Sequence, residues 1–222
     1  MDLLIILGIL IIPTIAQMYV MSNYNKFKAL ESEKKLSGFE VARKILDENG
    51  LEKIHVVETK GTLSDHYDPK RKVIRLSHDV FHGTSISAAS IAAHEVGHAI
   101  QDKENYIYMK IRSIIFPVVK IGTSLSYAII FIGFLAELTN MFYLGIALVS
   151  LGLIFQLVTL PVEFDASKRA KAAIAKYDLV SSGEMYGTEK VLGAAAMTYV
   201  AGVLSSALEL VRLILLFNNK RR

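Results

Sequence analysis

Apolar residues gather in four long stretches of the chain, separated by segments in which charged residues are frequent. The first stretch, residues 3–20, approaches the roughly 20 residues needed to cross a bilayer. It follows Met1-Asp2 rather than a basic segment, and no Ala-x-Ala cleavage site comes after it. We therefore expect residues 1–20 to be a retained N-terminal transmembrane anchor and not a cleaved signal peptide.

Two further apolar runs lie between residues 114 and 160, and the short polar segment 137–140 joins them. The first run contains a proline and a lysine near its start, whereas the second is long and uninterrupted. This pattern predicts a transmembrane helical hairpin over residues 113–160.

The last part of the chain, residues 161–222, is expected to add two helices. Pro161 suits the first position of one helix, and Thr188 can cap a final apolar helix over residues 191–217. The basic residues 220–222 favour the cytoplasm, which argues against a further crossing. We therefore expect three crossings plus a packed or re-entrant helix, with four crossings as the alternative.

Between the anchor and the hairpin, residues 21–112 have the mixed polar and apolar pattern of a folded domain. The segment 37–40 is a capping-box sequence, and the apolar positions that follow repeat with helical spacing until Asn49-Gly50. Residues 54–57 then read as a short strand, and residues 65–69 and 72–77 as a hairpin.

The second arm of this hairpin precedes the helix that carries the candidate chemistry. If residues 72–77 formed an edge strand, they could pair with an extended substrate by β-addition. A purely structural hairpin is the alternative.

The composition supports a membrane protein with one modest soluble part. Of the 222 residues, 52% are hydrophobic and 21% are charged, and the mean hydropathy is +0.39. The fold class expected is α+β: mostly helical, with a zincin-like catalytic domain, a small β-hairpin or sheet, and three or four transmembrane helices. There is no cysteine, so a metal site must use nitrogen and oxygen ligands.

The distribution of charge predicts how the chain is oriented in the membrane, and it argues against nucleic-acid binding. Residues 21–112 hold 15 Lys/Arg against 13 Asp/Glu, which is typical of a solvated surface and not of a nucleic-acid-binding stripe. Residues 162–190 are also rich in Lys and Arg, whereas the turn 137–140 has none. By the positive-inside rule both segments belong on the cytoplasmic side.

The candidate chemistry lies in residues 85–101, which read as one helix containing His94-Glu95-x-x-His98. Histidines four residues apart lie on one helical face and can bind one metal ion. Glu95 projects about 100° around the helix from His94, beside the metal, where a general base should be. Gly97 leaves room between the histidines. The pattern predicts a catalytic zinc site.

A catalytic zinc ion usually has three protein ligands and one open position. Glu163 and Asp165 stand where the chain returns from the hairpin, on the same side as His94, and either could supply the third ligand. Acidic residues in a first helical turn also need no metal. His66 is the rival ligand.

Three segments give a family resemblance: His94-Glu-Val-Gly-His-Ala-Ile-Gln101, Leu160-Pro-Val-Glu-Phe-Asp-Ala-Ser167 and Ala196-Met-Thr-Tyr-Val-Ala201. They resemble the YugP-like family of membrane zinc metallopeptidases, and more distantly the HtpX and CAAX prenyl protease type gluzincins. In the more distant HtpX and CAAX prenyl protease relatives the zinc-binding glutamate opens a Glu-x-x-x-Asp motif, which implies Glu163 as the third ligand. Here Ser167 replaces that aspartate.

The resemblance implies a bacterial plasma-membrane protein that binds one Zn²⁺ and hydrolyses polypeptides, among them membrane or membrane-proximal proteins. Glu95 would be the general base, and a second donor to the oxyanion could come from Tyr67, His66 or Tyr199. The alternative is a non-enzymatic zinc-binding adaptor or pseudoprotease, for which a glutamate at position 95 has no use.

Overall fold

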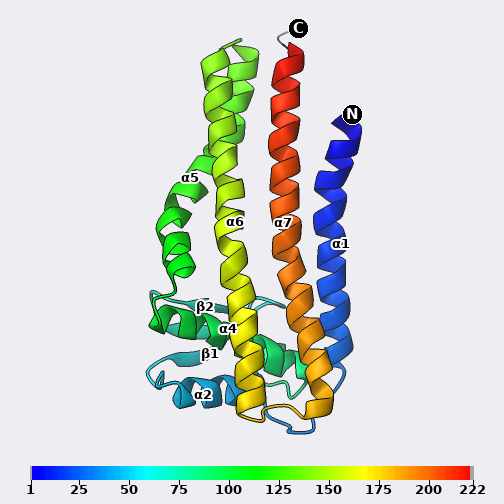
Figure 1. Ribbon diagram of the computed structural model, residues 1–222, viewed down its shortest axis with the longest axis vertical. Coiled ribbons are helices and arrows are strands. Elements are labelled where there is room, and N and C mark those ends of the chain that lie inside the picture. The colour runs from blue at the N-terminus through cyan, green and yellow to red at the C-terminus, as the bar shows by residue number, and fades with distance from the viewer. Residues whose placement is uncertain (1, 221–222) are drawn as a thin grey trace. The chain divides into compact units, whose positions relative to one another are not determined.

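The computed structural model describes residues 2–220 and combines long helices with one small sheet (Figure 1). The predicted α+β class, mostly helical with a small sheet, is confirmed. The elements in chain order are α1 (Asp2–Lys28), α2 (Gly38–Glu48), β1 (His55–Thr59), β2 (His66–Asp68), β3 (Val73–Ser77), α3 (His78–Phe81), α4 (Ile86–Lys103), α5 (Ile107–Leu135), α6 (Thr139–Lys176), the 3₁₀ turn η1 (Ser182–Glu184) and α7 (Met185–Lys220).

Four described helices are long and apolar enough to cross a membrane, judged by length and composition: α1, α5, α6 and α7. The fourth is the helix for which the sequence favoured a packed or re-entrant position. It runs without a break from Met185 to Lys220. Arg221 and Arg222, which argued against a fourth crossing, lie outside the described residues.

The chain divides into two compact units. The first consists of the residues up to Gln17, Ile107–Pro161, and the residues from Thr198 onward. Within it, α5, α6 and α7 meet in a cluster of buried side chains formed by Ile130, Phe142, Leu213 and Phe217. Many large apolar side chains of these helices remain exposed, as expected of helices that face lipid.

The second unit, Met18–Tyr106 and Val162–Met197, contains the sheet and the short helices. Helix α2 begins with the predicted capping box, in which the Ser37 side chain accepts from the Glu40 amide and Glu40 accepts in return. Its apolar stripe, Val41, Ile45 and Leu46, is fully buried. Gly50, at a φ of 64°, ends the helix in the left-handed region that glycine adopts without strain.

The sheet has the strand order β1-β3-β2. β2 and β3 form the predicted antiparallel hairpin, and β1 pairs with β3 in parallel. β3 is therefore the central strand. The hypothesis that residues 72–77 form a free edge for β-addition is wrong, because both sides of β3 are already hydrogen-bonded to neighbouring strands.

Two predicted helix starts are also wrong. Pro161 lies inside α6, which is one helix of 38 residues, and not at the entrance of a new one. Thr188 lies inside α7 with its hydroxyl buried, and Ser181 caps the η1 turn that leads into that helix. Both positions carry good start signals, but each long helix begins before them.

Candidate metal centre

Helix α4 supplies the two histidines. It begins at Ile86, where the Ser85 side chain accepts a hydrogen bond from the Ala88 amide, and it is buried along most of its length. His94 and His98 lie one turn apart, and their ring centroids are 4.8 Å apart. The helix thus presents two imidazoles on one face, as the sequence predicted.

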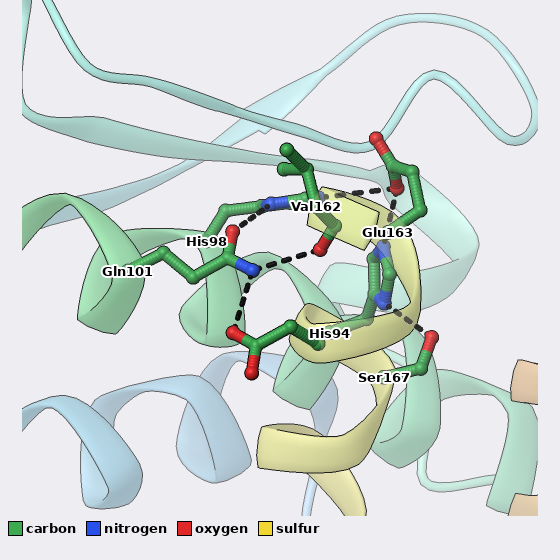
Figure 2. Close-up of polar contacts among 7 residues, drawn as sticks. His94, His98, Gln101, Val162, Glu163 and Ser167 are labelled. Carbon is green, nitrogen blue, oxygen red and sulfur yellow. Dashed lines mark hydrogen bonds and ion pairs between the residues drawn. The ribbon is translucent and has the colours of Figure 1, made fainter. Parts of the chain in front are cut away.

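Helix α6 brings a carboxylate to these imidazoles (Figure 2). One oxygen of Glu163 lies 3.3 Å from His94 Nε2 and 3.4 Å from His98 Nε2. The Glu163 side chain is 2% exposed. Sixty-nine positions separate it from His94 in the chain, yet the three ligand atoms lie within 4.8 Å of one another.

This spacing suits a metal ion. Ligand atoms held about 2.0–2.2 Å from zinc in a tetrahedron lie about 3.3–3.6 Å from one another. The two Glu163 distances fall in that range and are longer than an ordinary N–H···O hydrogen bond. The three side chains are nitrogen and oxygen donors, as expected for zinc in a chain without cysteine.

Each imidazole is also held from its far side. Ser167 Oγ lies 3.2 Å from His94 Nδ1, and Gln101 Oε1 lies 3.0 Å from His98 Nδ1 (Figure 2). If both Nδ1 atoms carry the proton, they donate to these oxygens and leave both Nε2 lone pairs directed at the same point. Such contacts fix the ring orientation of metal-binding histidines.

Gln101 links the two helices through its amide group. Its Nε2 donates to the Val162 carbonyl at 2.7 Å and to Asp165 at 2.9 Å, and the side chain is fully buried. Asp165 also forms an ion pair with Arg169 at 2.5 Å. Asp165, the alternative third ligand, thus contacts the group that holds His98 and is absent from the three-residue cluster.

The close approach of α4 and α6 depends on Gly97. A Cβ atom added there would lie 2.6 Å from the Ala166 carbonyl oxygen, which is a backbone atom of α6. We expected from the sequence that Gly97 leaves room between the histidines, and that explanation of the glycine is wrong. Gly97 leaves room for the helix that carries Glu163.

Glu95 is buried beside this cluster, with 7% of its surface exposed. Burial raises the pKa of its carboxyl, and the neighbouring His94 and His98 only partly offset that effect. Burial alone would lower the pKa of His98, but the contacts and charges of Glu163, Glu95 and Gln101 together outweigh it, so the pKa is raised. The charges of these neighbouring side chains therefore influence one another.

Two other candidates lie in different surroundings. His66, the rival ligand, is exposed, and its Nδ1 contacts the Ser64 carbonyl oxygen at 2.8 Å. The Tyr67 hydroxyl donates to Asp102 at 2.7 Å. Sequence reasoning missed Gln101 altogether, although a buried amide one turn after His98 on the same face was a usable signal.

The chain was compared with known proteins. A family model described as "Putative neutral zinc metallopeptidase" matches residues 2–218. The "Putative membrane protease YugP" of Bacillus subtilis (strain 168) is 47% identical over 206 residues, which cover 93% of this chain and 92% of that protein. No solved structure matches the chain.

The predicted resemblance is thereby confirmed, and the family's metal, Zn²⁺, is the cofactor. The four long apolar helices agree with the membrane character of the relative. The family match extends over almost every residue of both compact units. The chain therefore belongs to the family of zinc metallopeptidases that this model describes.

Proposed function

We propose that this chain is a membrane-embedded zinc metalloendopeptidase in which His94, His98 and Glu163 hold the metal and Glu95 is the general base. The observation that carries the proposal is the convergence of three donor atoms from α4 and α6. Both Nε2 atoms lie 3.3–3.4 Å from one oxygen of Glu163. Glu95 follows the first of these histidines directly in the chain.

Zinc, when bound, acts as a Lewis acid on a peptide carbonyl and lowers the pKa of bound water to about 7. In this proposal the Glu95 carboxylate takes the proton from the attacking water. It then gives that proton to the nitrogen of the leaving amine, so the peptide bond breaks with no net change in Glu95.

The surroundings of Glu95 suit this role. Its carboxyl is buried beside His94 and His98, and burial raises its pKa. Ser167 and Gln101 act differently: they hold the Nδ1 side of each imidazole and keep the Nε2 atoms available.

The side of the membrane on which the substrate is cleaved follows from the distribution of charge. Residues 21–112 and 162–190 contain most of the basic residues outside the apolar runs, and the turn 137–140 has none. We assign both basic segments to the cytoplasmic side of a bacterial plasma membrane, as the catalytic domain and its third-ligand helix. The substrates would be membrane or membrane-proximal polypeptides.

The test compares peptides released from bacterial membrane proteins by the purified wild type and by Glu95→Gln, with bound zinc measured in both. The variant should keep its zinc and lose roughly 10²–10⁴-fold in rate, the usual contribution of a general base. Equal rates would show that Glu95 is not the base. Zinc bound by both proteins with no peptide released by the wild type would favour the adaptor.

A further inference from the structure

A second group of metal-binding side chains lies on the surface of the unit that contains the sheet. Glu58 Oε1 lies 2.7 Å from His78 Nδ1, and Glu58 Oε2 lies 3.1 Å from His82 Nε2. One ligand atom from each of the three residues lies within 4.8 Å of those of the other two. Among the residues that the structure describes, His78 and His82 are the two histidines that share a carboxylate outside the buried centre.

The fold holds these residues in place. Glu58 is on β1 and pairs in register with Leu76 of β3, and α3 begins at His78, directly after β3 ends. Val80, in the middle of that short turn, is 1% exposed and anchors it in the core. His78 and His82 are four residues apart, so both rings stand on one side of the turn, with centroids 4.9 Å apart.

Stability does not account for this arrangement. The side chains of His78, His82 and Glu58 are 71%, 56% and 44% exposed. Exposed ion pairs and hydrogen bonds of this kind contribute little to folding. Two imidazoles one helical turn apart, with a carboxylate between them, are however a donor set that zinc and similar divalent ions bind.

We propose that Glu58, His78 and His82 form a second, surface site for a divalent transition-metal ion such as Zn²⁺. The ion binds the lone pairs of His78 Nδ1 and His82 Nε2 together with a Glu58 oxygen. Each neutral ring then carries its single proton on its other nitrogen, and any second ring proton is released to solvent. A fourth position stays open to water. The site binds more weakly than the buried centre, because its side chains are solvated and must move to bring three atoms to zinc distances. It selects ions that prefer imidazole and excludes Mg²⁺.

The experiment is a titration of the full-length, detergent-solubilised protein with Zn²⁺ in competition with a chromogenic chelator. The wild type should bind two equivalents, one tight and one weak. Glu58→Gln and His82→Ala should each lose the weak equivalent and keep the tight one. His55→Ala, which removes an exposed histidine from the same strand, should still bind two.

A separate variant distinguishes this site from the buried centre. His98→Ala should lose the tight equivalent and keep the weak one, whether or not the chain is a peptidase. Mg²⁺ in place of Zn²⁺ should give no weak equivalent. A wild type that binds one Zn²⁺, or a weak equivalent that survives in both Glu58→Gln and His82→Ala, would overturn the proposal.

Discussion

Ser167 lies one helical turn after Glu163 on α6, and it contacts the first histidine of the candidate centre. Its hydroxyl oxygen lies 3.2 Å from His94 Nδ1, and the side chain is 7% exposed. A neutral hydroxyl is a weaker acceptor than a carboxylate. This chain therefore holds His94 more weakly than an aspartate would.

Removing that acceptor should weaken zinc binding. We expect Ser167→Ala to raise the zinc dissociation constant by roughly 10–100-fold, the usual effect of losing such a partner. Ser167→Asp, which keeps an acceptor, should bind zinc more tightly than Ser167→Ala. Ser150→Ala is the matched control, because that hydroxyl bonds the Ala147 carbonyl elsewhere in α6. Competition with a zinc chelator measures all four proteins, and equal affinities would exclude this role for Ser167.

At this scale the sequence identified His94, Glu95, His98 and Glu163 as the candidate site, but not the residues that support them. The spacing of a helix places His98 relative to His94. No local pattern shows that Gln101 reaches Val162, because that contact joins positions 61 residues apart. Supporting contacts of this kind depend on how α4 and α6 pack.

At the scale of elements, the packing of α4 against α6 brings Glu163 to the histidines. Gly97 lies directly against the backbone of α6 at Ala166. A side chain there must displace the α6 backbone, since the atom it meets is the Ala166 carbonyl oxygen and not a flexible side chain.

Gly97→Ala should therefore destabilise the protein and the metal centre together. Overpacking at such a contact costs about 1–3 kcal/mol, and zinc affinity should fall because Glu163 moves with α6. Gly193→Ala is the control: its added Cβ would meet nothing within 4 Å, so it should be neutral or stabilising. Thermal unfolding in detergent measures the stability of each variant, and zinc titration in detergent measures its zinc affinity. A Gly97→Ala protein as stable and as tightly zinc-bound as the wild type would contradict this packing argument.

Most elements could be predicted from the sequence, since capping and periodicity are local signals. The helix ending at Glu48, the strands and α4 were all expected near their observed positions. The strand order was not, because the β1–β3 pairing depends on contacts across the sheet. The helix starts predicted at Pro161 and Thr188 are wrong for a related reason: in a long helix, tertiary packing outweighs a single start signal.

At the scale of the whole molecule, the orientation in the membrane remains a prediction. The absence of cysteine from the chain makes it testable, since one introduced cysteine is the sole thiol. Thr62 and Glu137 are both exposed and lie in connecting segments, one before β2 and the other between α5 and α6.

We expect Glu137→Cys to react with a membrane-impermeant maleimide in intact cells. Thr62→Cys should react only after the membrane is permeabilised, because the basic segment around it is assigned to the cytoplasm. The unmodified chain, labelled in parallel, gives the background. Labelling of Thr62→Cys in intact cells would place the catalytic domain on the opposite side.

The central claim is that one zinc ion is held by His94, His98 and Glu163, and its most direct test is zinc affinity measured across single variants. His94→Ala, His98→Ala and Glu163→Ala should each abolish tight binding, whereas Glu95→Gln and Asp165→Asn should keep it. If Glu163→Ala bound zinc as tightly as the wild type while Asp165→Asn did not, the proposed ligand set would be wrong.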